Sequence, residues 1–245
     1  MKENRYLTPQ EAAKVLNVSI STLKKFIYLG QIRTLKTPGG HHRILERDLF
    51  ANSSLQLPEI NQDSSLFEVS LGFIKILEKR LRFSQGHSLS VSKSSYLIGQ
   101  RMELSALDLQ RLQLAALMHD IGKTAINENI LNKPEPFSAE EYSIVKTHPV
   151  LGEGVLNAIK PFEELAPIVR QHHERVDGTG YPDGVRKDKI CLEARIITVA
   201  DSFDVMTSPN SYKRQLSKEE ALQEIKNNSG AQFDPEVVDV FLKIF

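Results

Sequence analysis

Apolar residues recur at helical spacing through most of the chain after residue 65, and this pattern constrains the fold more than any other feature. Eight segments carry them three or four positions apart, which places them on one face of an α-helix. The segments are 66–83, 88–102, 106–122, 139–156, 165–174, 191–207, 218–228 and 235–245. No convincing strand pattern follows residue 50. We therefore expect an all-α bundle over residues 66–245.

Residues 1–50 follow a different pattern. Thr8 can cap a helix, Pro9 suits its first position, and Glu11 completes a capping box. A second helix is expected from about Ser19 to Leu29, and two short runs around the glycine turn at 38–40 predict a β-hairpin. Helix, turn, helix and hairpin make a winged helix-turn-helix. The polar segment 51–65 is expected to link this domain to the bundle.

Charge and composition indicate which partners the protein binds and where in the cell it is expected. Residues 1–50 hold nine Lys and Arg against four Asp and Glu, a net of +5, so the rest of the neutral chain carries −5. A basic small domain beside an acidic large one suggests nucleic-acid contact by the first. The chain has no apolar run of about 18 residues, no apolar core of a signal peptide and a single cysteine. These features favour a cytoplasmic protein without membrane contact.

Five of the seven histidines lie in the expected bundle, and three of them stand in the adjacent polar pairs His119-Asp120 and His172-His173. The residues concerned are His87, His119, Asp120, His148, His172, His173 and Asp201. A single buried histidine is more often a hydrogen-bonded core residue than a ligand. Paired polar residues after apolar runs are harder to explain by packing, because burying them is costly unless something pairs with them. Asp201 alone could be a helix cap or a salt-bridge partner.

This combination of side chains suits divalent metal ions. Neutral imidazole and carboxylate together bind borderline divalent cations, and a carboxylate such as that of Asp120 can bridge two of them. Two ions about 3.5–4 Å apart clamp a phosphoryl group and lower the pKa of water towards about 7. The residues therefore indicate metal-assisted phosphoester hydrolysis.

Three blocks of the sequence resemble the signature of HD-GYP domains, a subgroup of the HD phosphohydrolase superfamily. They are HDIGK (119–123), HHERVDGTGYP (172–182) and VADSFDVMTS (199–208). The resemblance covers about residues 66–245. It implies a helical bundle with a two- or three-metal centre, often iron or manganese. It also implies hydrolysis of cyclic di-GMP to the linear dinucleotide pGpG or on to GMP.

The resemblance also implies roles for individual residues. One metal would be held by His87, His119, Asp120 and Asp201, and Asp120 would bridge to a second held by His148, His172 and His173. Asp120 and Lys123 would be catalytic, with Lys123 near the scissile phosphate. The substrate would meet the loop residues Gly178, Gly180, Tyr181 and Pro182, although this loop could also be only a tight turn between helices.

Two departures from the family pattern bear on metal count and substrate. Phe83 stands where some members carry a glutamate for a third metal, so two ions are expected. Asn210 and Lys213 replace two arginines of a family run, here PNSYK (209–213). Lys213 still offers a point charge to phosphate but not the forked geometry of arginine. The identity of the substrate is therefore less firmly implied than the metal chemistry.

Residues 5–50 resemble the helix-turn-helix of the MerR and excisionase-like families. The resemblance implies DNA contacts from the second helix and the wing. The candidates are Ser21, Thr22, Lys24, Lys25, Lys36, Thr37, His42 and Arg43. The alternative is a solvated basic face in a domain that contacts protein. One small domain makes few phosphate contacts, so we expect a homodimer.

Three functions follow from these features. The first is an active cyclic dinucleotide phosphodiesterase that a DNA-binding domain localises or regulates. The second is a transcription regulator that responds to the nucleotide with weak or no hydrolysis. The third keeps the hydrolytic chemistry but acts on another nucleotide or phosphoester.

Overall fold

The computed structural model describes residues 6–15, 34–37, 42–45, 62–81, 85–208 and 214–245, together with Ile20, Leu23, Ile27 and Ile32. Side chains are not described for Val15, Lys36 and residues 62–65. The chain forms two compact units, residues 1–64 and 65–245. Among the described residues, none of the helices has the length and apolar character that crossing a bilayer requires.

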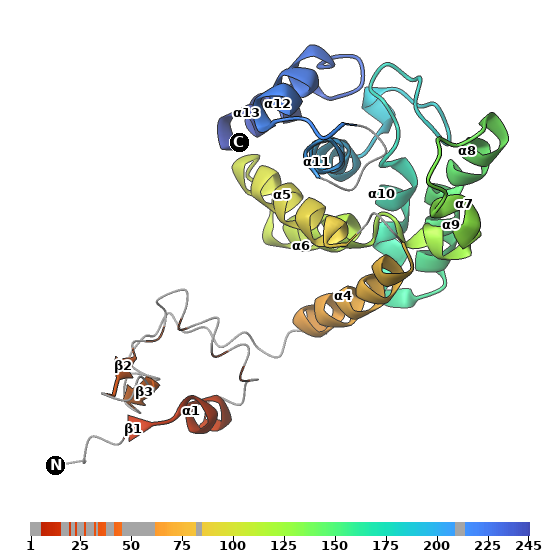
Figure 1. The fold of residues 1–245 in the computed structure, drawn as a ribbon. Coiled ribbons are helices and arrows are strands. Elements are labelled where there is room, and N and C mark those ends of the chain that lie inside the picture. The colour runs from red at the N-terminus through yellow and green to blue at the C-terminus, as the bar shows by residue number, and fades with distance from the viewer. Residues whose placement is uncertain are drawn as a thin grey trace. The chain divides into compact units, whose positions relative to one another are not determined.

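The N-terminal unit combines a short helix with a small antiparallel sheet. Its described elements are β1 (Tyr6–Leu7), α1 (Pro9–Val15), β2 (Leu35–Lys36) and β3 (His42–Leu45), and the strand order is β1-β3-β2 (Figure 1). The expected capping box is confirmed, since Thr8 N donates to Glu11 at 2.8 Å and Glu11 N donates to the Thr8 hydroxyl at 3.2 Å. Strands β2 and β3 form the predicted hairpin.

The predicted second helix lies outside the described residues, apart from three helical positions. These are Ile20, Leu23 and Ile27, which stand three and four residues apart. Leu23 is buried with Leu7 and Ile44 in the core of this unit. The expected linker also lies outside the described residues as far as residue 61.

All the named elements in the described part of the C-terminal unit are helices, as the spacing of apolar residues predicts. Its α-helices are α4 (Gln62–Arg80), α5 (His87–Arg101), α6 (Ala106–Met118), α7 (Glu128–Leu131), α8 (Ala139–Val145), α9 (His148–Asn157), α10 (Ala166–Gln171), α11 (Leu192–Thr207), α12 (Lys218–Asn227) and α13 (Pro235–Ile244). Three short 3-10 helices join them: η1 (Ile121–Ala125), η2 (Lys160–Leu165) and η3 (Lys187–Lys189).

Helix α11 lies at the centre of this unit. It packs against α5, α6, α10, α12 and α13, and Figure 1 shows it surrounded by them. Its residues from Ile196 to Asp201 are all buried, because neighbours cover most of its faces. A helix enclosed in this way carries Asp201 into the interior, where a carboxylate needs cationic or hydrogen-bonding partners.

One predicted helix is divided in two. We expected a single helix over residues 139–156, but α8 ends at Val145 and α9 begins at His148. Pro149 is the second residue of α9. A proline inside a continuous helix removes a backbone donor and clashes with the carbonyl four residues earlier, here that of Val145. The division leaves His148 at the start of the new helix.

Glycine at position 122 allows η1 and α9 to touch backbone to backbone. A Cβ atom on Gly122 would lie 2.0 Å from the carbonyl oxygen of His148 and 2.5 Å from the amide nitrogen of Gly152. No side chain fits at this distance without moving one of the two segments. Residue 122 therefore fixes the separation between Asp120, which precedes η1, and His148.

We expect Gly122→Ala to lower the free energy of unfolding of the C-terminal unit by about 1–3 kcal/mol or more, because backbone atoms cannot yield as a side chain can. Gly154→Ala in α9 is the matched control, since nothing lies within 4 Å of its added methyl group. That control should be neutral or stabilising by up to about 1 kcal/mol. Urea unfolding followed by circular dichroism measures both, and equal stabilities would contradict the close contact.

Candidate metal centre

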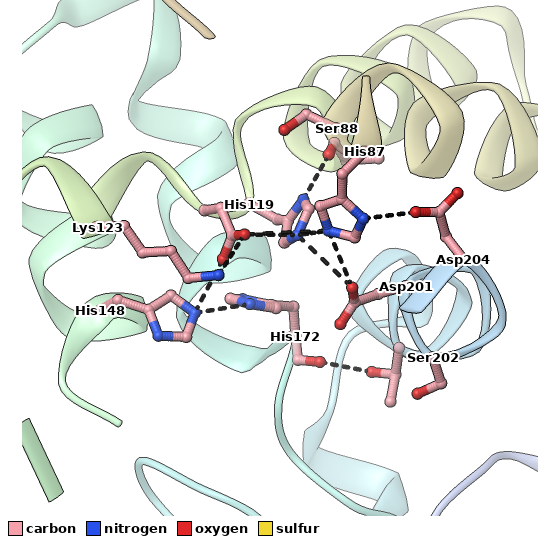
Figure 2. Close-up of polar contacts among 12 residues, drawn as sticks. His87, Ser88, His119, Lys123, His148, His172, Asp201, Ser202 and Asp204 are labelled. Carbon is pink, nitrogen blue, oxygen red and sulfur yellow. Dashed lines mark hydrogen bonds and ion pairs between the residues drawn. The ribbon is translucent and has the colours of Figure 1, made fainter. Parts of the chain in front are cut away.

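All the predicted ligands except Asp201 stand at or beside helix ends, and these ends converge on one region. His87 begins α5, His119 follows the last residue of α6, His148 begins α9, His172 and His173 follow α10, and Asp201 lies within α11. Figure 2 shows the labelled histidines directed at a common centre with Asp201. His119, His148 and His172 are at most 1% exposed. Segments separated by more than 100 residues thus meet in one buried polar cluster.

Three of the histidines are oriented by the same local hydrogen bond. In each, the ring Nδ1 lies beside the carbonyl oxygen three residues earlier. The pairs are His119 with Ala116 at 2.8 Å, His148 with Val145 at 2.8 Å and His172 with Val169 at 2.6 Å. A carbonyl oxygen only accepts, so Nδ1 carries the proton and the Nε2 lone pair of the neutral ring faces the centre. Carbonyls at helix ends are available for this bond because they lack intrahelical partners.

His87 is oriented by a carboxylate that the sequence analysis did not identify. Its Nδ1 lies 2.7 Å from Oδ2 of Asp204. Asp204 stands three residues after Asp201 on α11, so the two carboxylates share one face of that helix. This spacing is the signal that could have pointed to it. A carboxylate behind a metal-binding imidazole fixes the ring and raises its basicity.

The side chains divide into two groups joined by Asp120. Potential ligand atoms lie within 4.8 Å of one another in the group His87, His119 and Asp201, and in the group His148, His172 and His173. Asp120 lies between these groups. Its Oδ2 is 3.5 Å from Nε2 of His119, and its Oδ1 is 3.4 Å from Nε2 of His148. One carboxylate therefore presents a separate oxygen to each group.

The distances between facing ring nitrogens indicate whether the cluster suits cations. Nε2 of His87 lies 3.3 Å from Nε2 of His119, and Nε2 of His148 lies 3.2 Å from Nε2 of His172. Both His148 and His172 use Nδ1 as a donor, so in the neutral rings two lone pairs face each other. A cation between such nitrogens removes this repulsion. The donor set of imidazole and carboxylate fits a divalent metal ion.

The protonation states of most groups also suit metal ligation. Burial lowers the pKa of His148 to about 3 and that of His173 to about 4, and it lowers the pKa of His172 as well. The pKa of Asp120 is depressed although burial opposes this, because Lys123 and several imidazoles surround it. Neutral imidazoles and an ionised carboxylate are the forms that bind metal.

His87 is the exception among the imidazoles. Burial lowers its pKa, but hydrogen bonds to Asp201 and Asp204 outweigh burial and raise the pKa to about 10. A proton on His87 therefore neutralises part of the local negative charge when no other cation does so. A divalent ion among the same carboxylates would supply that positive charge and leave the ring neutral.

Lys123 lies at the edge of the cluster. Its Nζ is 2.6 Å from Oδ2 of Asp120, and its side chain is 23% exposed. Lys123 follows Asp120 by three residues in η1, so both project from the same turn. A cationic group thus stands between the buried carboxylate and solvent.

The loop after α10 folds against the cluster through Glu174 and Tyr181. The Tyr181 ring stacks on that of His173, with 4.8 Å between ring centres. Buried Glu174 accepts hydrogen bonds from the backbone nitrogens of Asp183, Gly184 and Val185. The sequence does not predict this role of Glu174, because the three backbone nitrogens that donate to its carboxylate come close to it only when the loop folds.

Two glycines shape this loop for different reasons. Gly178 has a φ of +82°, which favours glycine, whereas a Cβ on Gly180 would lie 2.4 Å from the backbone nitrogen of Arg175. Pro182 follows Tyr181 directly. The predicted substrate residue Lys213, like Asn210 and Phe83, lies outside the described residues.

The predicted DNA contacts are described only in the wing. Thr37 follows β2, and His42 and Arg43 lie on β3 with Lys36 opposite His42 in register. The His42 ring Nδ1 is 2.9 Å from the Thr34 hydroxyl, and Arg43 donates to the His42 carbonyl at 3.1 Å. Ser21, Thr22, Lys24 and Lys25 lie outside the described residues.

Family models match both units of the chain. The HD domain model matches residues 72–237, and a helix-turn-helix domain model matches residues 6–52. The chain is 37% identical over 174 residues to 3'3'-cGAMP-specific phosphodiesterase 3 of Vibrio cholerae, covering 71% of this chain. It is 40% identical over 181 residues to a cyclic di-GMP phosphodiesterase of Thermotoga maritima, covering 73% of this chain. The matches span only 38% and 49% of those two relatives.

Solved structures share the helical fold. A cyclic GMP-AMP specific phosphodiesterase of Vibrio cholerae superposes with a TM-score of 0.55 at 25% identity, covering 73% of this chain and 48% of that chain. An HDG"Y"P protein from Bdellovibrio bacteriovorus superposes with a TM-score of 0.55 at 24% identity, covering 64% and 51%. The second likeness concerns the fold alone.

We expect Asp204→Asn to weaken metal binding by about 10–100-fold, because the His87 ring loses the carboxylate that orients it. Titration with Mn²⁺ against a chelating dye measures the affinity without reference to catalysis. Asp239→Asn on α13 removes an exposed carboxylate and should leave the affinity unchanged. An unchanged affinity in Asp204→Asn, with the helical spectrum intact, would show that Asp204 does not support the centre.

Proposed function

Because the chain belongs to the HD domain family, as an HD-GYP member with an N-terminal helix-turn-helix domain, we propose that it is a metal-dependent phosphodiesterase that hydrolyses cyclic di-GMP. The observation that carries this proposal is the position of Asp120. Its two oxygens face two separate groups of imidazoles at 3.5 and 3.4 Å. That arrangement suits a pair of cations beside a phosphodiester.

The proposed cofactors are two divalent ions, iron or manganese. One would be held by His87, His119, Asp120 and Asp201, and the other by Asp120, His148, His172 and His173. When bound, such ions offset the negative charge of a phosphodiester and lower the pKa of water. The hydrogen bonds from Nδ1 to backbone carbonyls support this division, because they direct Nε2 atoms of both groups inward.

Residues at the rim of the cluster are proposed to bind the substrate. Lys123 is a cation beside Asp120, so it can stabilise the charge on the phosphate or give a proton to the leaving oxygen. Tyr181, stacked on His173, places an aromatic ring where a nucleotide would approach. Gly178, Gly180 and Pro182 shape this loop, and Lys213 is proposed as a further phosphate contact.

The proposed substrate rests on relatives with two different specificities. One similar protein is named a cyclic di-GMP phosphodiesterase and another is named cGAMP-specific, at 40% and 37% identity. Both substrates are cyclic dinucleotides with two phosphodiester bonds, so both suit the same metal chemistry. We favour cyclic di-GMP and use cyclic GMP-AMP as the comparator in the assay below.

Full-length protein loaded with Mn²⁺ or Fe²⁺ should convert cyclic di-GMP to pGpG or GMP, measured by chromatography of the products. Asp120→Asn should lower turnover by more than the factor of about 10–100 that is typical of residues behind the ligands, because the amide has no negative charge and keeps only one of the two oxygens that face the two groups. Lys133→Met, at a lysine that pairs with Glu141 in α8, is a surface control. If the protein binds metal but does not hydrolyse cyclic di-GMP, the proposal is contradicted. If it hydrolyses only cyclic GMP-AMP or another phosphoester, the proposed substrate is wrong.

A second candidate function is a transcription regulator that responds to the nucleotide. The observation that favours it is the match of a helix-turn-helix model to residues 6–52 of the same chain. The helical unit would bind the nucleotide, and the N-terminal unit would change its affinity for DNA. Weak hydrolysis is compatible with this function, since a regulator needs only a difference in binding between two states.

Two histidine variants separate the two functions. His148→Ala should abolish turnover and leave the affinity for DNA without nucleotide unchanged, whereas His42→Ala in the wing should weaken DNA binding several-fold and leave turnover unchanged. DNA fragments selected from a random pool provide the ligand for a binding assay with and without cyclic di-GMP. Equal affinities in both conditions would remove the regulator function. Failure to select any DNA would contradict DNA binding by the N-terminal unit.

A further inference from the structure

Helix α4 carries an apolar stripe on its exposed side. Val69, Phe73 and Ile76 are 53%, 56% and 63% exposed, although their residue types favour burial. Their spacing of four and three residues places them on one line along the helix. The adjoining face of α4 is already packed, since Ile74 and Leu77 are buried in the core of the C-terminal unit and Leu77 follows Phe73 by one turn. The apolar face of the helix is therefore wider than the part that the described residues cover.

The exposed stripe has a gap at its centre. Gly72 lies between Val69 and Ile76 on the same side, and no atom lies within 4 Å of the position that a Cβ would take. A glycine in the middle of an exposed helical face lowers helix stability. It also allows a second helix to approach closely, because no side chain separates the two backbones.

Charged residues flank the gap with opposite signs. Exposed Glu68 precedes Gly72, and exposed Lys75 and Lys79 follow it. If two copies of α4 pack antiparallel across Gly72, Glu68 of each copy meets the lysines of the other, and Val69 meets Ile76. A parallel pair would instead place like charges side by side, which is unfavourable. The stripe is thus complementary to itself under a two-fold rotation.

We propose that this face of α4 binds a second copy of the chain, with the two α4 helices packed antiparallel about Gly72. The pair forms an isologous interface in which each copy contributes Val69, Phe73 and Ile76. A single helix pair is a small interface, so its association is weak and depends on concentration.

The same arrangement suits the DNA-binding role proposed for the N-terminal unit. Helix α4 has 19 residues, which corresponds to a length of about 28 Å. In an antiparallel pair, the two chains enter their α4 helices at opposite ends and thus about that far apart. DNA half-sites one helical turn apart are separated by about 34 Å. The dimer itself does not depend on the proposed DNA binding or hydrolysis.

Sedimentation of the full chain over a range of concentrations tests the interface. The wild-type mass should rise from one copy to two, and Phe73→Glu should raise the dissociation constant at least tenfold. Leu107→Glu on α6 is the matched control, because Leu107 is 62% exposed and lies outside the stripe. A single copy at every concentration, or equal effects of the two variants, would overturn the proposal. Circular dichroism shows whether each variant remains folded.

Charge exchange tests the antiparallel arrangement. Glu68→Lys alone, or Lys75→Glu with Lys79→Glu, should weaken the dimer because like charges then meet. All three substitutions together should restore it. Gly72→Cys should form a disulfide-linked dimer under mild oxidation, whereas Glu68→Cys should not, because its copies lie far apart along the helix axis. If Gly72→Cys and Glu68→Cys form disulfide-linked dimers to the same extent, the helices pack parallel and the proposed antiparallel arrangement is overturned.

The chain's own N-terminal unit is the competing occupant of this face. In that case the wild type stays monomeric, and Phe73→Glu increases proteolytic cleavage between residues 46 and 61. This outcome overturns the proposal. Turnover by the metal-loaded protein is a separate measurement, so failure of the dimer and failure of the proposed activity are distinguishable.

Discussion

The cluster depends first on the hydrogen bond between an imidazole Nδ1 and a carbonyl at a helix end, which orients three of its five histidines. His119, His148 and His172 each make it with the residue three positions earlier. The bond fixes both the tautomer and the direction of the ring without any long-range contact. The bundle then has only to bring the helix ends together, because each local turn already directs its Nε2 lone pair. Helix boundaries thus determine the chemistry as much as residue types do.

Close packing then sets the distances among these ring nitrogens. Gly122 permits backbone contact between η1 and α9, which brings Asp120 to 3.4 Å from His148. Thr198 of the central helix α11 donates its hydroxyl to the carbonyl of His172 at 2.8 Å, which ties α10 to α11. Two close contacts of different kinds therefore join two pairs of elements around the cluster: backbone atoms join η1 to α9, and a buried hydroxyl joins α10 to α11.

The sequence predicts the residues that touch the centre better than those that position them. Adjacent pairs such as His119-Asp120 stand out because packing alone does not explain them, and helical spacing predicts nearly every element. The sequence does not predict the roles of Asp204 and Glu174, because their partners come close only when the chain folds. These partners are the His87 ring and the backbone of residues 183–185. Pro149 in the sequence is a signal for the break between α8 and α9. The apolar pattern continues across this proline, however, and therefore favours a single helix.

The cluster has an excess of groups that repel one another in the absence of cations. Facing imidazole nitrogens and ionised carboxylates are buried together, and the structure relieves part of this repulsion by a raised pKa at His87 and by Lys123 beside Asp120. Such an arrangement costs folding stability compared with an apolar core of similar volume. Natural proteins depart from the rules of stable packing mainly at functional sites. The repulsion among these groups would be relieved by divalent ions in the folded chain alone, because the same groups do not gather in the unfolded chain, so bound ions would stabilise the fold.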